Sequence, residues 1–367
     1  MFPDLLTYAP TVTAEFHLSL PQDLITSLHL LQLVDDFEGL SDWVYQIAAA
    51  LPEDFRAELG LLDYPIKWCF RRQDSLIWRL APAHLAHADI EAFRSYLEAT
   101  PATEFRRVLL LNLALAAEQP SVDGADDTML RRMLSQVRQS EREKRGQAFA
   151  DRVDEEQLVE LVQQPQSFKG RLIRLLTRFW EQYYRQDFES HREALARSVA
   201  YHQRQTYPRD FISLFRQVTG RVLSPSVRDY VQGHIGQVAR VIFSPCAHLG
   251  LYFQLTLSHQ TLVVAFNYRT TPAYETTGTA TVELFPPLKA LADETRLHIL
   301  SLLRERELCA QEIVKAVGLS QSTVSRHLQL LERTEVVTSR QAHRTKFYSI
   351  NQAKSQQILN ALRRLIG

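Results

Sequence analysis

The chain has 367 residues, of which 45% are hydrophobic and 23% are charged, and its formal net charge at pH 7 is zero. This composition is typical of a globular protein that is large enough for two domains. No apolar run reaches the roughly 18 residues that a membrane span needs. The start, "MFPDLLTYAP", lacks the positively charged residues of a secretory signal. We therefore expect no membrane partner. The three cysteines are sparse and odd in number, which indicates reduced thiols in a cytoplasm.

Helical patterns dominate the first two thirds of the chain. Residues 12–18 alternate between apolar and polar side chains, as a half-buried strand does. Five later segments have helical patterns, and Gly220 is a natural helix end for the last of them. The predicted helices cover 22–34, 42–50, 130–147, 172–183 and 211–220.

Strand patterns follow late in this part of the chain. Residues 239–244, 251–257 and 261–268 predict strands, and the last two are separated by a connection short enough for a hairpin. The early strand at 12–18 is a candidate to join them. The predicted fold class is therefore α+β, with a mostly helical N-terminal domain, a small β-sheet and a separate C-terminal domain.

A threonine-rich segment, 268–281, has no periodicity and predicts a linker. It divides the chain into an N-terminal domain, 1–267, and a C-terminal domain, 282–367. Residues 284–367 hold thirteen Lys/Arg and seven Asp/Glu, a net charge of +6, so the remainder carries −6. A basic C-terminal domain on an acidic body indicates a polyanionic partner for that domain.

A helix-turn-helix pattern lies in the basic domain. Residues 310–317 predict a short helix whose inner face is aliphatic. Gly318 can adopt the left-handed turn, Leu319 is expected to fill the corner, and Ser320 is a natural N-cap for the next helix.

The second helix of this pattern has two distinct faces. At 100° per residue, Ser322, Ser325, Arg326 and Gln329 share one side. The opposite side is aliphatic and consists of Val324, Leu328 and Leu331. One long cation, an amide and small hydroxyls can enter a DNA groove and contact phosphates and base edges. His327 lies at the boundary between the faces, either buried or in reach of a phosphate.

Two strands, 336–340 and 346–350, follow this helix. They predict a hairpin with His343 and Arg344 at its tip and Arg340 and Lys346 beside it. A basic hairpin behind a recognition helix is a wing, whose targets are phosphates or the adjacent minor groove.

Several motifs in order resemble one family. The segments "ALADETRLHILSLL", "ELCAQEI" and "GLSQSTVSRHLQLLE" and the wing resemble the winged helix-turn-helix domain of ArsR-type bacterial transcriptional regulators. More loosely, "SLHLLQLVDD" and "VIFSPCAHLG" resemble a long subgroup with a poorly characterised N-terminal domain. The resemblance implies binding to double-stranded DNA at an inverted-repeat operator. The predicted contact residues are Gln321, Ser322, Thr323, Ser325, Arg326, His327, Gln329, Arg340, His343, Arg344 and Lys346.

The last helix of the domain, within 352–367, has an apolar stripe formed by Ile358, Leu362 and Leu365. The resemblance implies that this helix packs with the first helix of the domain to form a homodimer. The alternative is that it packs against its own chain.

Two features of the sequence depart from the family pattern. Metal-sensing members have a Cys-x-Cys pair, whereas here Cys309 is followed by Gln311 at the second position. The final helix also lacks His and acidic residues. A thiolate site needs several soft ligands, so we expect no metal in this domain and an unidentified non-metal effector. At the wing turn, His343 replaces the usual Gly, and His tolerates left-handed backbone better than most residues.

No catalytic motif stands out in the N-terminal domain. His84 and His87 lack the glutamate of a zinc-hydrolase helix, and Gly233 and Gly236 are not part of a phosphate loop. The aromatic residues of "RFWEQYYRQDF" fit a core better than a ligand pocket. We therefore predict a cytoplasmic transcriptional regulator, not an enzyme, without a cofactor, whose N-terminal domain senses a ligand or mediates assembly. The alternative is an enzyme domain fused to a DNA-binding module that controls its own expression.

Overall fold

The computed structural model of the chain describes residues 12–71, 75–77, 89–119, 126–145, 147–258, 260–271, 279–342 and 345–366. The chain forms two compact units. The first consists of Met1–Leu33, Ser41–Leu249 and Phe253–Thr271, and the second of Val34–Leu40, Gly250–Tyr252 and Pro272–Gly367. Within the described ranges, no helix is both long and apolar enough to span a membrane.

The division into units differs from the predicted domain boundaries in two ways. Two short segments from the predicted N-terminal domain, 34–40 and 250–252, belong to the second unit. In addition, helix α14 begins at Thr279, inside the predicted linker, and Tyr268–Thr270 form a 3₁₀ turn. The middle of that linker, 272–278, lies outside the described residues. Local composition did not reveal these assignments because they depend on contacts between segments distant in sequence.

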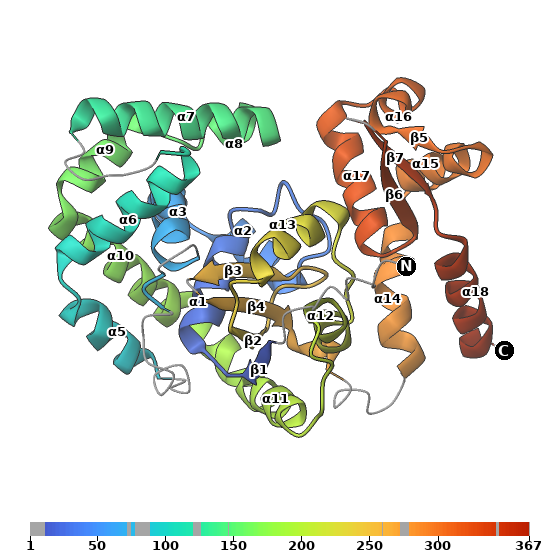
Figure 1. The fold of residues 1–367 in the computed structure, drawn as a ribbon, viewed down its shortest axis with the longest axis horizontal. Helices are drawn as coiled ribbons and strands as arrows, with labels where there is room; N and C mark the ends of the chain where they lie inside the picture. The colour runs from blue at the N-terminus through green and yellow to red at the C-terminus, as the bar shows by residue number, and fades with distance from the viewer. Residues whose placement is uncertain are drawn as a thin grey trace, which may run out of the picture. The chain divides into compact units, whose positions relative to one another are not determined.

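A four-stranded sheet forms the centre of the first unit, in the order β1-β2-β4-β3 (Figure 1). The pairs β1–β2 and β2–β4 are parallel, and β3–β4 is an antiparallel hairpin that places Ser258 opposite Thr261. Both the expected hairpin and the expected recruitment of the early strand are confirmed. The strands are β1 (Thr13–Phe16), β2 (Arg240–Cys246), β3 (Gln254–Ser258) and β4 (Thr261–Asn267).

Helices cover the sheet, so its central strands are buried along most of their length. The six residues that follow Arg240 in β2 are all buried, as expected for a parallel strand covered on both faces. On one face, Phe16, Phe243 and Phe266 belong to an apolar cluster with Phe215 of helix α12. That helix ends at Gly220 in the left-handed conformation, with φ of 64°, as predicted.

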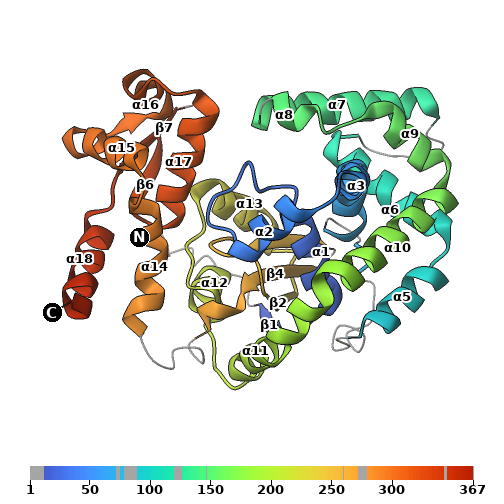
Figure 2. The same cartoon turned by 180° about the vertical axis from the view of Figure 1, so that it is seen from behind.

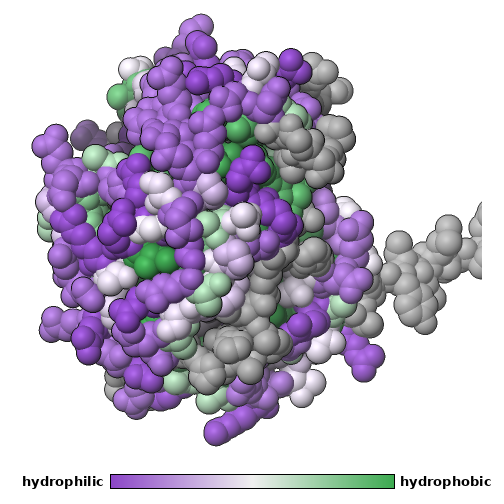
Figure 3. All heavy atoms as spheres, turned by 90° about the vertical axis from the view of Figure 1, so that its left-hand side faces the viewer, coloured by the Kyte–Doolittle hydropathy of each residue, from purple (hydrophilic) through white to green (hydrophobic). Residues whose placement is uncertain are grey.

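The rest of the first unit is a set of packed helices, seen from the front and from behind in Figures 1 and 2. The outward face shown in Figure 3 is mainly hydrophilic, with small hydrophobic areas. The helix predicted over 22–34 begins earlier, at Leu20, because Ser19 caps its start, and it ends earlier, because the chain turns after Leu30. The helices are α1 (Leu20–Leu30), α2 (Asp42–Ala50), α3 (Glu53–Phe70), α5 (Ile90–Ala99), α6 (Ala102–Ala116), α7 (Asp127–Arg145), α8 (Gln147–Ala150), α9 (Glu155–Gln163), α10 (Pro165–Phe179), α11 (Arg185–Gln203), α12 (Phe211–Thr219) and α13 (Pro225–Ile235).

A π-helical turn, Trp180–Tyr184, joins α10 to α11 without a break. Such turns occur mostly as single insertions within α-helices and often lie near functional sites. Its aromatic residues belong mainly to the core, since Trp180 and Tyr184 are buried and Phe179 just before them is fully buried. The expectation that this aromatic segment serves the core is confirmed.

The second unit is a winged helix. Its three-stranded sheet has the order β5-β7-β6, and both pairs are antiparallel. Helices α15, α16 and α17 pack against one another, and α14 packs against α18 within the same chain. The elements are α14 (Thr279–Leu291), α15 (Glu294–Glu305), β5 (Leu308–Cys309), α16 (Ala310–Val317), α17 (Gln321–Arg333), β6 (Val337–Ala342), β7 (Thr345–Ile350) and α18 (Gln352–Ile366).

Candidate DNA-binding surface

Helix α17 is anchored by its aliphatic face. Val324, Leu328 and Leu331 are fully buried, and the helix contacts α15, α16 and β6. Burying such a side chain stabilises the fold by roughly 1.5–3 kcal/mol. The rotation of the helix about its axis is therefore fixed, and its polar face must point away from this core.

The turn before α17 has the geometry that the sequence predicts, apart from one residue. Gly318 ends α16 in the left-handed conformation with φ of 76°. The hydroxyl of Ser320 accepts a hydrogen bond from the Thr323 amide at 3.2 Å, which caps α17. Leu319, however, remains 38% exposed. The expectation that it fills the corner is wrong, and the residue of α16 that is buried in the interior is Ile313.

The polar face of α17 is accessible along most of its length. Gln321, Ser322 and Gln329 are exposed, while Thr323 and Ser325 are half-buried. Arg326 has a partner within the second unit: its guanidinium donates to the backbone carbonyl of Asp35 at 2.9 Å. A peptide carbonyl holds an arginine less strongly than a phosphate does, because the phosphate carries a full charge.

His327 lies on the inner side of α17. Its ring is buried, with Nδ1 at 3.4 Å from the Arg296 guanidinium and 3.8 Å from the Asp293 carboxylate. Burial is the largest cause that lowers its pKa. A buried neutral ring does not attract a phosphate, so the structure does not support His327 as a DNA contact. The helical projection placed His327 at the boundary between the two faces. Packing of α17 against α15 turns the side chain inward.

The two described cations of the wing each pair with a glutamate of the same unit. Nε of Arg340 donates to Glu307 at 2.8 Å, and Nζ of Lys346 donates to Glu332 at 2.8 Å. The pair with Glu307 holds the pKa of that carboxyl below its usual value. Both pairs are exposed or only partly buried, so they are weak and exchangeable with phosphate. His343 and Arg344 lie outside the described residues.

The segment Val34–Leu40 packs within the second unit through arginine contacts. The guanidinium of Arg333 lies 3.9 Å from the ring centre of Tyr252 and 5.6 Å from that of Phe37. The buried guanidinium of Arg296 donates to the Glu38 carboxylate at 2.6 Å. No sequence pattern within this acidic segment predicted that it packs with the winged helix. The only signal was the acidic composition of the segment, "VDDFEGL", together with the net charge of +6 on residues 284–367.

Two glycines allow this segment to approach residues 250–252 closely. The Leu251 amide donates to the Gly39 carbonyl at 2.9 Å, and the backbone of Gly250 has φ of 59°. A Cβ atom on Gly250 would lie 2.0 Å from the Gly39 carbonyl oxygen. No side chain fits at this position without displacing the segment.

We expect Gly250→Ala to destabilise the second unit. The left-handed backbone alone costs about 1–3 kcal/mol for a residue with a side chain, and the clash with Gly39 adds to this. Chemical denaturation measures the change in the free energy of unfolding. Gly236→Ala is the matched control, since a Cβ there meets nothing within 4 Å and its φ is −62°. Equal stability of both variants would contradict the close approach.

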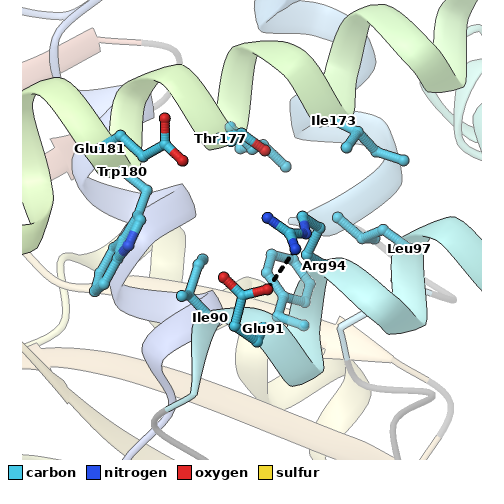
Figure 4. A pocket seen from close by; sticks show the side chains of 10 residues that line it. Ile90, Glu91, Arg94, Leu97, Ile173, Thr177, Trp180 and Glu181 are labelled. Atoms are coloured by element: carbon cyan, nitrogen blue, oxygen red, sulfur yellow. Dashed lines mark ion pairs between the residues drawn. The ribbon is translucent and has the colours of Figure 1, made fainter.

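A separate groove lies in the first unit between α5 and α10 (Figure 4). It is lined mainly by apolar side chains, and Glu91 and Arg94, both on α5, form an ion pair of 2.5 Å on one side of it. Trp180 forms one end of the groove. This lining suits packing of an apolar group better than acid–base chemistry.

Comparison with known proteins identifies the second unit. The model of the family described as "Bacterial regulatory protein, arsR family" matches residues 293–339. The transcriptional activator HlyU of Vibrio cholerae is 38% identical over 78 residues, which are 21% of this chain and 72% of HlyU. The chain belongs to the ArsR family. The arsenical resistance operon repressor of Staphylococcus aureus is 39% identical over 80 residues, which are 22% of this chain and 77% of the repressor.

Among solved structures, HlyU from Vibrio cholerae has 34% sequence identity to this ArsR-family chain and a TM-score of 0.21. The match covers 24% of this chain and 96% of HlyU. The matched residues of these relatives account for about a quarter of the chain or less. The residues that the family model matches, 293–339, include the helix-turn-helix, whereas the first unit lies outside them.

Proposed function

We propose that the protein is a sequence-specific regulator of transcription that binds double-stranded DNA through α17 and the wing. The observation that carries this proposal is the fixed orientation of α17. Its aliphatic face is fully buried, and its hydroxyl, amide and arginine side chains face outward. Relatives of the same family are named as a transcriptional activator and as operon repressors.

Binding to a base edge requires that Arg326 leave the Asp35 carbonyl. The exchange is favourable because a guanidinium forms two parallel hydrogen bonds with a guanine edge, whereas it forms one with this carbonyl. The hydroxyls of Ser322 and Thr323 lie in the first turn of α17, where the helix dipole favours phosphate. Together these groups provide both positioning and base contacts.

We also propose a homodimer that binds an inverted repeat, formed through the terminal helix. Ile358 of the predicted stripe is buried, and α18 packs against α14 of its own chain, but two other apolar residues of α18 support this interface: Leu359 is 49% exposed and Ile366 is 81% exposed. Two recognition helices related by two-fold symmetry reach half-sites about one helical turn apart. The first unit then serves as a sensor for an unidentified effector or as an assembly domain. The names of the ArsR-family relatives support a transcriptional regulator more than they support an enzyme domain fused to a DNA-binding module.

Arg326→Ala should weaken specific DNA binding roughly ten- to a hundredfold, because the loss of a good base contact costs about 1–3 kcal/mol. Titration of labelled promoter fragments measures this change. Arg304→Ala is the matched control: Arg304 is exposed on α15 and pairs with its neighbour Glu305. Equal affinity of the Arg326 variant and the unmodified protein would remove α17 from the interface.

Arg344→Ala should weaken binding to operator and random DNA by similar factors, because the wing anchors phosphates without reading sequence. The slope of log affinity against log salt should become shallower by about one unit. The measurement is a salt series with both DNA ligands. A loss confined to operator DNA would instead show that Arg344 reads the shape of a narrow minor groove.

Leu359→Asp should shift the protein from dimer to monomer, because a charge in an apolar interface loses its hydration without a partner. Sedimentation velocity at several protein concentrations measures the association. Leu115→Asp serves as the control, since Leu115 is similarly exposed (45%) but lies on α6 of the first unit. A dimer that survives Leu359→Asp but not Leu115→Asp would move the interface to the first unit.

A further inference from the structure

Three metal-binding types of side chain converge in the first unit, away from the winged helix. Asp187 and His191 lie one turn apart on α11, and His248 follows the end of β2 by two residues. One ligand atom from each lies within 4.8 Å of the other two. The carboxyl ends of parallel strands are a common location for binding sites in open α/β sheets, and β2 and β4 both end here.

The Asp187 carboxylate stands between the two imidazole rings. Nε2 of His248 is 2.6 Å from one carboxylate oxygen, and Nε2 of His191 is 3.6 Å from the other. Two atoms bound tetrahedrally to a zinc ion at about 2.1 Å lie roughly 3.4 Å apart. Small rotations of these side chains therefore place the three ligand atoms around one ion.

The outer nitrogen of each ring has a hydroxyl partner. Nδ1 of His248 is 2.9 Å from the Ser41 hydroxyl, and Nδ1 of His191 is 3.1 Å from the Tyr268 hydroxyl. Metal-bound histidines almost always donate their second ring N–H to an oxygen acceptor, which fixes the tautomer and aims the other nitrogen at the ion, and a hydroxyl oxygen can serve as that acceptor. Here both rings direct Nε2 toward the same carboxylate.

The surroundings hold the rings still but leave the carboxylate reachable. The His248 ring stacks on Trp43 with centres 4.0 Å apart, and its side chain is 2% exposed. The side chains of Asp187 and His191 keep 15% and 18% exposure.

We propose that Asp187, His191 and His248 bind one divalent transition-metal ion, of the zinc or iron(II) class. Two imidazoles and one carboxylate form a set of borderline and hard ligands that suits these ions and leaves a coordination position open. The sequence did not predict this site, and from it we expected an effector that is not a metal. No spacing motif joins residues that the fold brings together from α11 and from the end of β2. The site is independent of the proposed DNA-binding function.

Cobalt(II) titration of the full-length, chelator-treated protein tests this site. We expect one equivalent per chain, with visible d–d absorption and without the thiolate band that binding at Cys309 would give, and displacement by zinc. Asp187→Asn and His191→Gln should each weaken cobalt binding at least tenfold. Tyr268→Phe should weaken it about ten- to a hundredfold, as loss of the hydroxyl behind a histidine ligand does.

Matched controls separate loss of the ligand from loss of the fold. His234→Gln on α13 should leave cobalt binding unchanged, and circular dichroism should show the same helix content in every variant. Three results would overturn the metal site. They are no cobalt uptake by the unmodified protein, equal uptake by the Asp187 and His191 variants, and loss of uptake in Cys309→Ser.

Discussion

Burial of one face of α17 is the constraint on which the winged helix depends. The helix cannot turn about its axis without exposing Val324, Leu328 and Leu331, each of which is fully buried. Its polar side chains are therefore presented at fixed angles before any partner arrives. Such preorganisation reduces the entropy that binding would otherwise cost. The same constraint turns His327 inward, where burial and the nearby Arg296 keep it from serving as a surface cation.

Inside the second unit, arginine side chains also connect segments that are distant in sequence. Arg296 is buried and donates to the Glu38 carboxylate and to the carbonyls of Lys289 and Ala290. A buried guanidinium is stable only when its hydrogen-bonding capacity is filled. The segment 34–40 supplies part of that requirement, and through the Asp35 carbonyl it also holds Arg326. The residue that we assign to base reading is thus in contact with a segment more than 280 positions earlier in the chain.

In the first unit, the direction of the parallel strands determines where polar side chains come together. Strands β2 and β4 run side by side in the same direction, so the residues that follow them meet at one edge. His248 and Tyr268 follow these strands, and α11 brings Asp187 and His191 to the same place. The result is a connected polar cluster at the end of an apolar sheet, where water is partly excluded and hydrogen bonds are stronger than in solvent.

The sequence alone determined the features that depend on neighbouring residues. The faces of α17, the cap at Ser320, the helix end at Gly220, the left-handed turn at Gly318 and the β3–β4 hairpin were all predicted, because periodicity and backbone preference act over a few positions. Tertiary structure decided the rest. It assigned 34–40 to the second unit, turned His327 inward, paired Arg340 with Glu307 and brought Asp187 to His248. These outcomes depend on contacts between residues from 31 to 291 positions apart, and no local pattern encodes which distant segments will meet.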